Sequence, residues 1–201
     1  MSNKQVIVIG GGAAGLMAAG YAAIRGHQVT LLEKMNRTGL KIGISGKGRC
    51  NLTNVLPLEE FLTHFGPNGR FLRQCFHQFF TSELQTFFEA RGVPLIIERG
   101  GRVFPASGRA LDVVHALRDW LVECGVTIRK NQRVTEIQTE RGRVCAVYMD
   151  RKRLDCSTVI LATGGNSYPR TGSTGDGYAL AAAHGHTIIP PRPALVPLTS
   201  T

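Results

Sequence analysis

Residues 6–19 read VIVIGGGAAGLMAA, a β-branched run that passes through three consecutive glycines into a run of small residues. The β-branched part predicts a buried strand over residues 5–9. The small residues predict a helix over residues 13–25, which Gly26 ends. A strand that turns directly into a helix is typical of an α/β protein with a parallel sheet.

Three glycines in this stretch, Gly10, Gly12 and Gly15, have the spacing G-x-G-x-x-G. Between a strand and a helix, the first makes the tight turn and the second lets the backbone approach a pyrophosphate, while the third allows close packing of helix and sheet. The N–H groups near Ala13 and Ala14 are the expected phosphate donors. The motif predicts dinucleotide binding; the alternative is a glycine-rich turn in an unrelated α/β protein.

An acidic residue follows the second expected strand, which covers residues 29–32. This residue, Glu33, lies 18 positions after Gly15. A carboxylate at this point accepts hydrogen bonds from ribose hydroxyls and disfavours a 2′-phosphate. The spacing supports a dinucleotide but does not separate NAD from FAD.

The rest of the chain alternates between helices and short strands, with a helical excursion at about residues 55–92. The expected elements are helices at 58–65, 69–79 and 82–91, a hairpin at 93–105, a helix from Ser107 or Arg109 to Glu123, strands at 126–129, 134–139, 143–149 and 155–162, a helix at 177–184 and a strand at 187–189. Residues 190–201 are rich in proline and are expected to form a linker.

The composition favours a phosphate-bearing ligand. The 201 residues carry a net charge of +10, but the basic residues are dispersed. RNA is therefore kept as the alternative partner, with no specific nucleic acid expected.

Five cysteines without a Cys-x-x-Cys pair argue against a disulfide framework or a zinc site, and for a reducing, cytoplasmic location. His184-x-His186 is explained by a helix end, so no metal is expected, and the run at residues 13–24 is too short to span a membrane.

A second motif lies in residues 158–169, TVILATGGNSYP, where an expected buried strand ends in Ala162-Thr163-Gly164. Together with the early glycine motif, this pairing resembles FAD proteins of the glutathione-reductase-like superfamily. In those proteins the strand that opens the β-meander contacts adenine, which here implies a contact from Val134. The alternative is an ordinary buried strand that ends in glycine.

The loop at residues 33–54, EKMNRTGLKIGISGKGRCNLTN, indicates a narrower family. With the stretches at 101–117 and 159–186, it closely resembles the BaiN-like bacterial FAD-dependent oxidoreductases, which are also labelled aminoacetone-oxidase-like. The resemblance implies a Rossmann-type FAD/NAD(P)-binding fold with a β-meander over residues 1–189. It also implies that the loop runs along the pyrophosphate and under the flavin, where its glycines allow close approach of the cofactor.

The resemblance assigns cofactor-binding roles to residues of both motifs and of the loop, with Lys41 and Arg49 offsetting phosphate charge and Cys50 in a packing role. The candidate cofactor-binding residues are Gly10, Gly12, Ala13, Ala14, Gly15, Glu33, Lys34, Lys41, Ser45, Gly46, Gly48, Arg49, Cys50, Asn51, Val134, Ala162, Thr163, Gly164 and Asp176. No catalytic acid or base is identified from the spacing.

The expected function is that of an FAD-dependent oxidoreductase acting on a small organic molecule, with NAD(P)H as the candidate reductant. Members of the family are about twice as long as this chain and carry a substrate domain after the region that matches residues 190–198. The chain is therefore expected to be the FAD-binding N-terminal half, inactive alone and of undetermined oligomeric state. The alternatives are an RNA-acting flavoprotein and a non-catalytic nucleotide-binding fragment.

Overall fold

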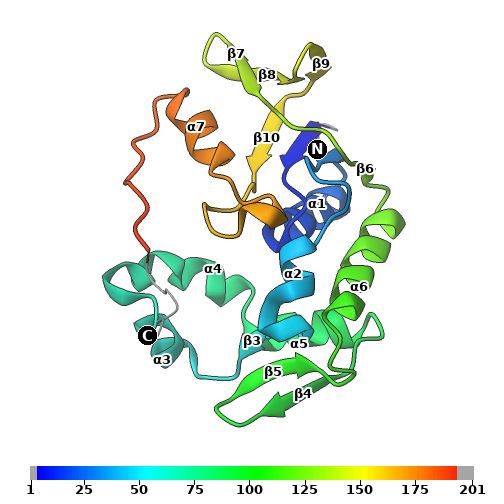
Figure 1. Cartoon of the computed structure of the whole chain (residues 1–201), viewed down its shortest axis with the longest axis vertical. Helices are drawn as coiled ribbons and strands as arrows, with labels where there is room; N and C mark the ends of the chain where they lie inside the picture. Colours follow the sequence, from blue (N-terminus) through cyan, green and yellow to red (C-terminus); the bar gives the residue numbers. More distant parts are fainter. Residues whose placement is uncertain (1–3, 194–201) are drawn as a thin grey trace, which may run out of the picture.

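The computed structural model describes residues 4–193, which form a layered α/β unit with a smaller hairpin sheet and a group of short helices (Figure 1). The central sheet is parallel and has the strand order β10-β1-β2-β6. Its strands are β1 (Gln5–Ile9), β2 (Gln28–Leu32), β6 (Thr127–Arg129) and β10 (Thr158–Leu161).

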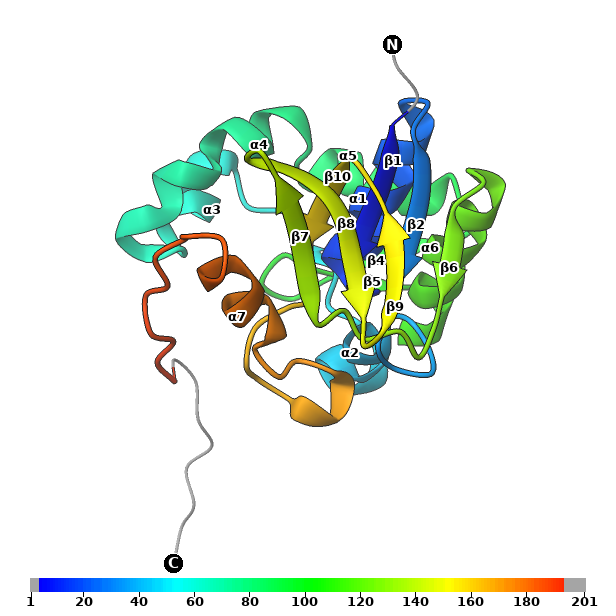
Figure 2. The ribbon, with the colours of Figure 1, turned by 90° about the horizontal axis from the view of Figure 1, so that it is seen from above.

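Alternate residues of β1 face two separate cores. Val6 and Val8 pack against α1 (Ala13–Ile24) and α6 (Ala110–Glu123), whereas Ile7 and Ile9 face the other side of the sheet. There they meet an antiparallel meander of β7 (Glu136–Glu140), β8 (Arg143–Met149) and β9 (Lys152–Asp155). Figure 2 shows this meander lying across the parallel sheet. Both faces of β1 are covered, and a strand buried on both faces is expected to be apolar throughout, as this continuous β-branched run is.

The helix layer is tightly packed around one tryptophan. The ring of Trp120 on α6 lies edge-on to Tyr21, at 5.7 Å between centroids, and to Phe87, at 4.7 Å. A Cβ at Gly20 of α1 would collide with the same ring, so α1 approaches α6 closely at this point. This packing holds the amino-terminal end of α1 at the carboxyl edge of the sheet.

The excursion consists of α3 (Leu58–Thr63), α4 (Arg73–Gln78), α5 (Thr81–Glu89) and the short 3-10 helix at Gly66–Leu72. Four of its phenylalanines form a small aromatic cluster. Phe61, Phe65, Phe76 and Phe80 lie with ring centroids 5.1 to 5.8 Å apart, although Phe71 stays 84% exposed.

A second antiparallel sheet contains β3 (Thr53–Asn54), β4 (Leu95–Glu98) and β5 (Arg102–Pro105) in the order β3-β5-β4.

The fold class expected from the sequence is confirmed, and three local expectations are corrected. The loop at residues 35–54 contains a short helix, α2 (Leu40–Ile44), and a 3-10 turn at Ser45–Gly48. The strand expected at 155–162 is β10, which begins only at Thr158, and residues 152–155 form an additional strand, β9, in a different sheet. Residues 187–189 form no strand, because no strand lies beside them among the described residues.

The last helix is α7 (Asp176–Ala182), after the short 3-10 helix Pro169–Thr171. The linker expected at 190–201 is described only as far as residue 193, and residues 190–193 are exposed without regular structure. Within residues 4–193, no helix combines the length and the apolar character that crossing a bilayer requires.

Candidate functional site

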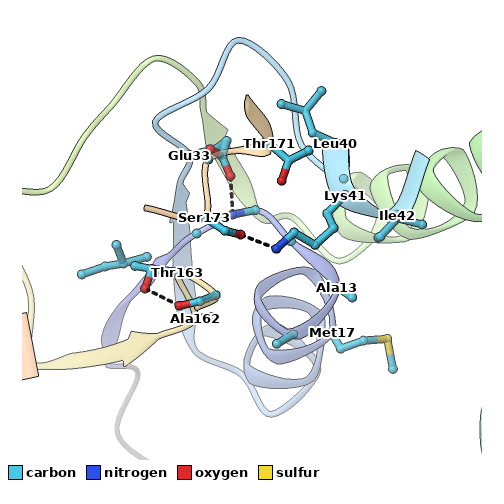
Figure 3. A pocket seen from close by; sticks show the side chains of 18 of the residues that line it. Ala13, Met17, Glu33, Leu40, Lys41, Ile42, Ala162, Thr163, Thr171 and Ser173 are labelled. Atoms are coloured by element: carbon cyan, nitrogen blue, oxygen red, sulfur yellow. Dashed lines mark hydrogen bonds between the residues drawn. The ribbon is translucent and has the colours of Figure 1, made fainter. Parts of the chain in front are cut away.

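A cavity of about 800 Å³ opens where the central strands end. Ile9, Leu32 and Leu161, the last residues of β1, β2 and β10, line it together with the amino-terminal end of α1 and parts of α2 and α7. Ligands of open α/β sheets bind at this carboxyl edge. Figure 3 shows the cavity side chains, which come from segments far apart in the sequence.

The three glycines of the first motif have different structural roles. A Cβ at Gly10, whose φ is +107°, would collide with the Ala162 carbonyl, and a Cβ at Gly15 would collide with the Gly10 carbonyl. A Cβ at Gly12 would meet no atom within 4 Å, because this residue borders the open cavity. The first and third glycines thus bring strand and helix together, while Gly12 leaves space for a ligand against the backbone. This arrangement fits a pyrophosphate.

Glu33 is held in a defined orientation at the end of β2. Its Oε2 accepts the N–H of Gly11 at 2.7 Å, and its Oε1 accepts the N–H of Met35 at 2.7 Å. A carboxylate has about four acceptor sites, so roughly two remain after these bonds. Glu33 lines the cavity although it is only 9% exposed. An oriented carboxylate with free acceptor sites fits a ribose diol.

Lys34, Arg133 and Asp176 form a second polar group, close to Glu33. The Lys34 ammonium lies 2.9 Å from Asp176 Oδ2, and the Arg133 guanidinium bonds both carboxylate oxygens, at 3.1 and 3.2 Å. Thr174 accepts a bond from Lys34 and donates one to Asp176. Burial alone would raise the pKa of Asp176, but the bonds from Lys34, Arg133 and Thr174 lower it to about 2. Asp176 is therefore ionised at neutral pH.

Lys41 of α2 also lines the cavity. Its ammonium donates to Ser173 Oγ at 2.6 Å and to the Ser167 carbonyl at 2.8 Å, and burial lowers the pKa of this group. Over residues 4–193, no carboxylate forms an ion pair with Lys41. A partly buried cation without a carboxylate fits an anionic ligand such as a pyrophosphate.

Only some of residues 45–51 line the cavity. Ser45, Cys50 and Asn51 line the cavity, whereas Gly46, Gly48 and Arg49 lie outside its lining. Cys50 is 5% exposed, and burial raises the pKa of its thiol in spite of a hydrogen bond with Ser45, as expected of a packed residue.

Gly46 and Arg49, both expected to bind the cofactor, make contacts within the protein. Gly46 has a φ of +55°, and a Cβ there would lie 2.9 Å from the backbone nitrogen of Asn51. A glycine is therefore needed here for the turn of the loop itself. Arg49 pairs with Glu98 of β4 and lies 4.4 Å from the ring centre of Phe104, so its charge is directed to the hairpin and not to the cavity.

The remaining predicted residues lie together. Ala13, Ala14, Val134, Ala162, Thr163 and Gly164 all line the same cavity. Val134 is buried but precedes β7 instead of belonging to it. The sequence did not indicate Gly11, Ser173 or Arg133. Arg133 directly precedes the predicted adenine contact, and this position in the sequence could have indicated that it belongs to the site.

Comparisons with known proteins agree with this geometry. Residues 4–196 match the family model described as HI0933-like protein Rossmann domain. The 3-dehydro-bile acid delta(4,6)-reductase of Clostridium scindens is 38% identical over 97% of this chain and 47% of its own length. The ribosomal RNA dihydrouridine synthase of Haemophilus influenzae is 32% identical over 98% of this chain and 49% of its own length. The chain thus spans about half the length of these curated relatives.

Two solved structures share the fold at low sequence identity. The 3-ketosteroid-delta4-(5alpha)-dehydrogenase of Rhodococcus jostii aligns with a TM-score of 0.66 at 19% identity, over 92% of this chain and 55% of that one. A flavocytochrome c3 fumarate reductase aligns with a TM-score of 0.65 at 21% identity, over 91% of this chain and 40% of that one. The family match covers nearly the whole chain and confirms the resemblance found in the loop motif: the chain belongs to the HI0933-like family and carries its Rossmann domain.

Proposed function

We propose that this chain is the FAD-binding part of an FAD-dependent oxidoreductase. One observation carries the proposal: Gly12, which borders open space, and Glu33, which is oriented by two backbone N–H groups, line the same cavity at the carboxyl edge of the sheet. Gly12 leaves room for a pyrophosphate, and Glu33 offers acceptors for the adjoining ribose.

The rest of the cavity supports FAD as the dinucleotide. Val134 supplies an apolar contact for adenine, Lys41 supplies charge for the pyrophosphate, and the late Ala162-Thr163-Gly164 segment packs against the Gly10 turn. Ser45 and Asn51 lie on the part of the wall assigned to the flavin ring. FAD, when bound, supplies the electron transfer, and the protein binds and orients it.

The two relatives suggest reduction as the direction of the reaction. One name describes a reductase that acts on a bile acid, and the other describes an enzyme that forms dihydrouridine, so both describe addition of hydrogen. We extend this chemistry to the present protein, with a small organic molecule as substrate and NAD(P)H as the proposed electron donor. The sequence contains no second nucleotide-binding motif, so we assign no residue of this cavity to NAD(P)H.

Titration of the purified chain with FAD tests the proposal directly. We expect saturable binding, a perturbed flavin absorption spectrum, and competition by ADP, since ADP carries the ribose and pyrophosphate that Glu33 and Gly12 accommodate. NADPH should compete less well than ADP, because its 2′-phosphate faces the Glu33 carboxylate. Absence of FAD binding, or displacement by NADPH as efficient as by ADP, would contradict the assignment.

A second candidate substrate is RNA, because two relatives are ribosomal RNA dihydrouridine synthases and the chain carries a net charge of +10. Binding of a ribosomal RNA fragment, measured between 50 and 300 mM salt, separates the candidates. Sequence-independent affinity that disappears at moderate salt indicates contact with phosphates only. Affinity that persists and differs between RNA fragments would favour the RNA substrate over the small molecule.

A further inference from the structure

The Asp176 carboxylate has its hydrogen-bonding capacity filled by the protein. Its two oxygens accept four bonds: one from Lys34, two from Arg133 and one from the Thr174 hydroxyl. About four bonds is the full capacity of a carboxylate. Glu33, which lines the same cavity, accepts two bonds within residues 4–193, both from backbone N–H groups. The two acids of this wall therefore differ, because Glu33 can still accept bonds from a ligand and Asp176 cannot.

The cations bound to Asp176 retain donors of their own. An ammonium has three N–H donors and a guanidinium has five. Lys34 uses two of its donors, on Asp176 and Thr174, and Arg133 uses two on Asp176. Both side chains line the cavity next to Glu33 and Val134. Within residues 4–193, both cations thus keep donors without a protein acceptor, on residues that line the part of the cavity suited to adenosine and its phosphates.

The same carboxylate connects three separate segments of the chain. Lys34 follows β2, Arg133 follows β6, and Asp176 is the first residue of α7. Backbone bonds reinforce one side of this junction: the Gln132 N–H donates to the Glu33 carbonyl at 2.9 Å, and the Asn131 N–H donates to the Met35 carbonyl at 3.1 Å. Asp176 is the side-chain link that joins α7 to the other two segments.

We propose that Asp176 is a positioning residue that holds Lys34 and Arg133 against the adenosine-diphosphate half of the bound dinucleotide, without touching the nucleotide itself. This inference rests on the proposed FAD site, and it concerns one end of that site only. The contrary effect is electrostatic: the Asp176 charge repels a pyrophosphate, so its removal alone would tighten binding. Because two cations lose their orientation when the carboxylate is lost, we expect the positioning effect to dominate.

The test measures FAD and ADP affinity by calorimetry for the wild-type chain, Asp176→Asn, Arg133→Gln and the double variant. Asp176→Asn should weaken both ligands by the same factor of about ten, because the ADP half is common to them. Arg133→Gln should weaken both about fivefold in the wild-type background and almost not at all beside Asp176→Asn. Asp155→Asn is the matched control, since Asp155 pairs with Arg153 outside the cavity and its side chain is 80% exposed.

Several results would overturn the inference while leaving the FAD site intact. These are unchanged or tighter ADP binding by Asp176→Asn, a larger loss for FAD than for ADP, or independent effects of the two substitutions. If Asp176→Asn fails to fold, Arg133→Gln still decides, because the Arg133 side chain is 65% exposed and its replacement spares the fold. Unchanged ADP affinity in that variant would refute the positioning role. A wild-type chain that binds neither FAD nor ADP would instead refute the proposed function, and the positioning role with it.

Discussion

The backbone N–H of Gly11 donates a 2.7 Å hydrogen bond to Oε2 of Glu33, which lies 22 residues further along the chain. The bond joins the glycine turn after β1 to the acid after β2, the two features that the proposed function assigns to adjacent groups of a dinucleotide. It also explains why position 11 is a glycine, since a Cβ there would press against Thr38 and Glu33. The acid is therefore part of the turn before any ligand binds.

Replacement of Glu33 by glutamine should weaken both the fold and the site. Whichever way the amide is turned, its NH2 group faces the N–H of Gly11 or of Met35, and one buried donor is left without an acceptor. We expect a loss of about 1–3 kcal/mol in the free energy of unfolding of the ligand-free chain, measured by urea denaturation. The ADP affinity should fall as well.

Glu59→Gln is the matched control for this prediction. Glu59 pairs with Arg73 at the surface, where its side chain is 67% exposed, so the same chemical change should alter stability by less than about 1 kcal/mol. Equal unfolding midpoints for Glu33→Gln and the wild-type chain would show that Glu33 is not held by the two backbone groups.

The glycines of the first motif should separate into binding and folding positions. Gly12→Val places its side chain in the open cavity, at a backbone φ of −81° that valine adopts without strain. It should therefore abolish detectable FAD and ADP binding while the thermal midpoint of the ligand-free chain stays within a few degrees of wild type. Gly15→Ala should instead unfold the chain, because its Cβ collides with the Gly10 carbonyl. Retained nucleotide binding by Gly12→Val would disprove the phosphate position.

The sequence predicted the central elements well because their residues are decided locally. Strand β1 has the expected bounds, since both its faces are buried and its β-branched side chains suit both. The short helix α2 was missed because Gly43 lies within it and glycine disfavours helices. Strand β9 was not predicted, because its pairing with β8 is a property of the tertiary structure.

For the candidate site too, the sequence predicted best those residues that are placed by local structure. Motif residues that follow strands, such as Glu33 and Thr163, line the cavity. Arg49 and Gly46 do not line it: Arg49 pairs with Glu98 from a hairpin 49 residues away, and Gly46 lies in an exposed turn. The four bonds to Asp176 depend on three distant segments, so no local pattern reveals them.

Asp176 should make the stability of the chain depend on acid pH. Its pKa is about 2 in the folded chain, against about 3.9 when unfolded. A lowered folded-state pKa gives stability that is complete above about pH 4 and is lost as the pH falls toward 2. The difference corresponds to about 2 kcal/mol.

Urea denaturation at several pH values between 2 and 6 measures this dependence for the wild type and for Asp176→Asn. Because the other carboxyl groups titrate in both proteins, the difference between the two curves isolates Asp176. The wild type should lose about 2 kcal/mol more than the variant over this range. Parallel curves would mean that Lys34 and Arg133 do not stabilise the ionised carboxylate.

The outer strand of the parallel sheet leads to a prediction about the chain as a whole. Strand β10 pairs with β1 on one side, and among the described residues nothing pairs with its other edge. Its apolar residues are only half-buried, and Leu161 at its end is 38% exposed. Unpaired edges of this kind promote association between chains. We therefore expect the 201-residue chain to self-associate in sedimentation velocity experiments and to bind FAD weakly.

Fusion of this chain to the C-terminal half of the Clostridium scindens relative should reverse both properties, because the relative is about twice as long and shares 38% identity over the common part. Burial of an aromatic system the size of the flavin ring covers roughly 150–250 Å², and at about 25 cal/mol per Å² this amounts to several kcal/mol. Flavin titration should accordingly show FAD affinity at least a hundredfold higher in the fusion, while the ADP affinity changes little, since the proposed ADP contacts lie within residues 10–134. Equal FAD affinity in the two proteins would show that this chain alone already encloses the flavin ring.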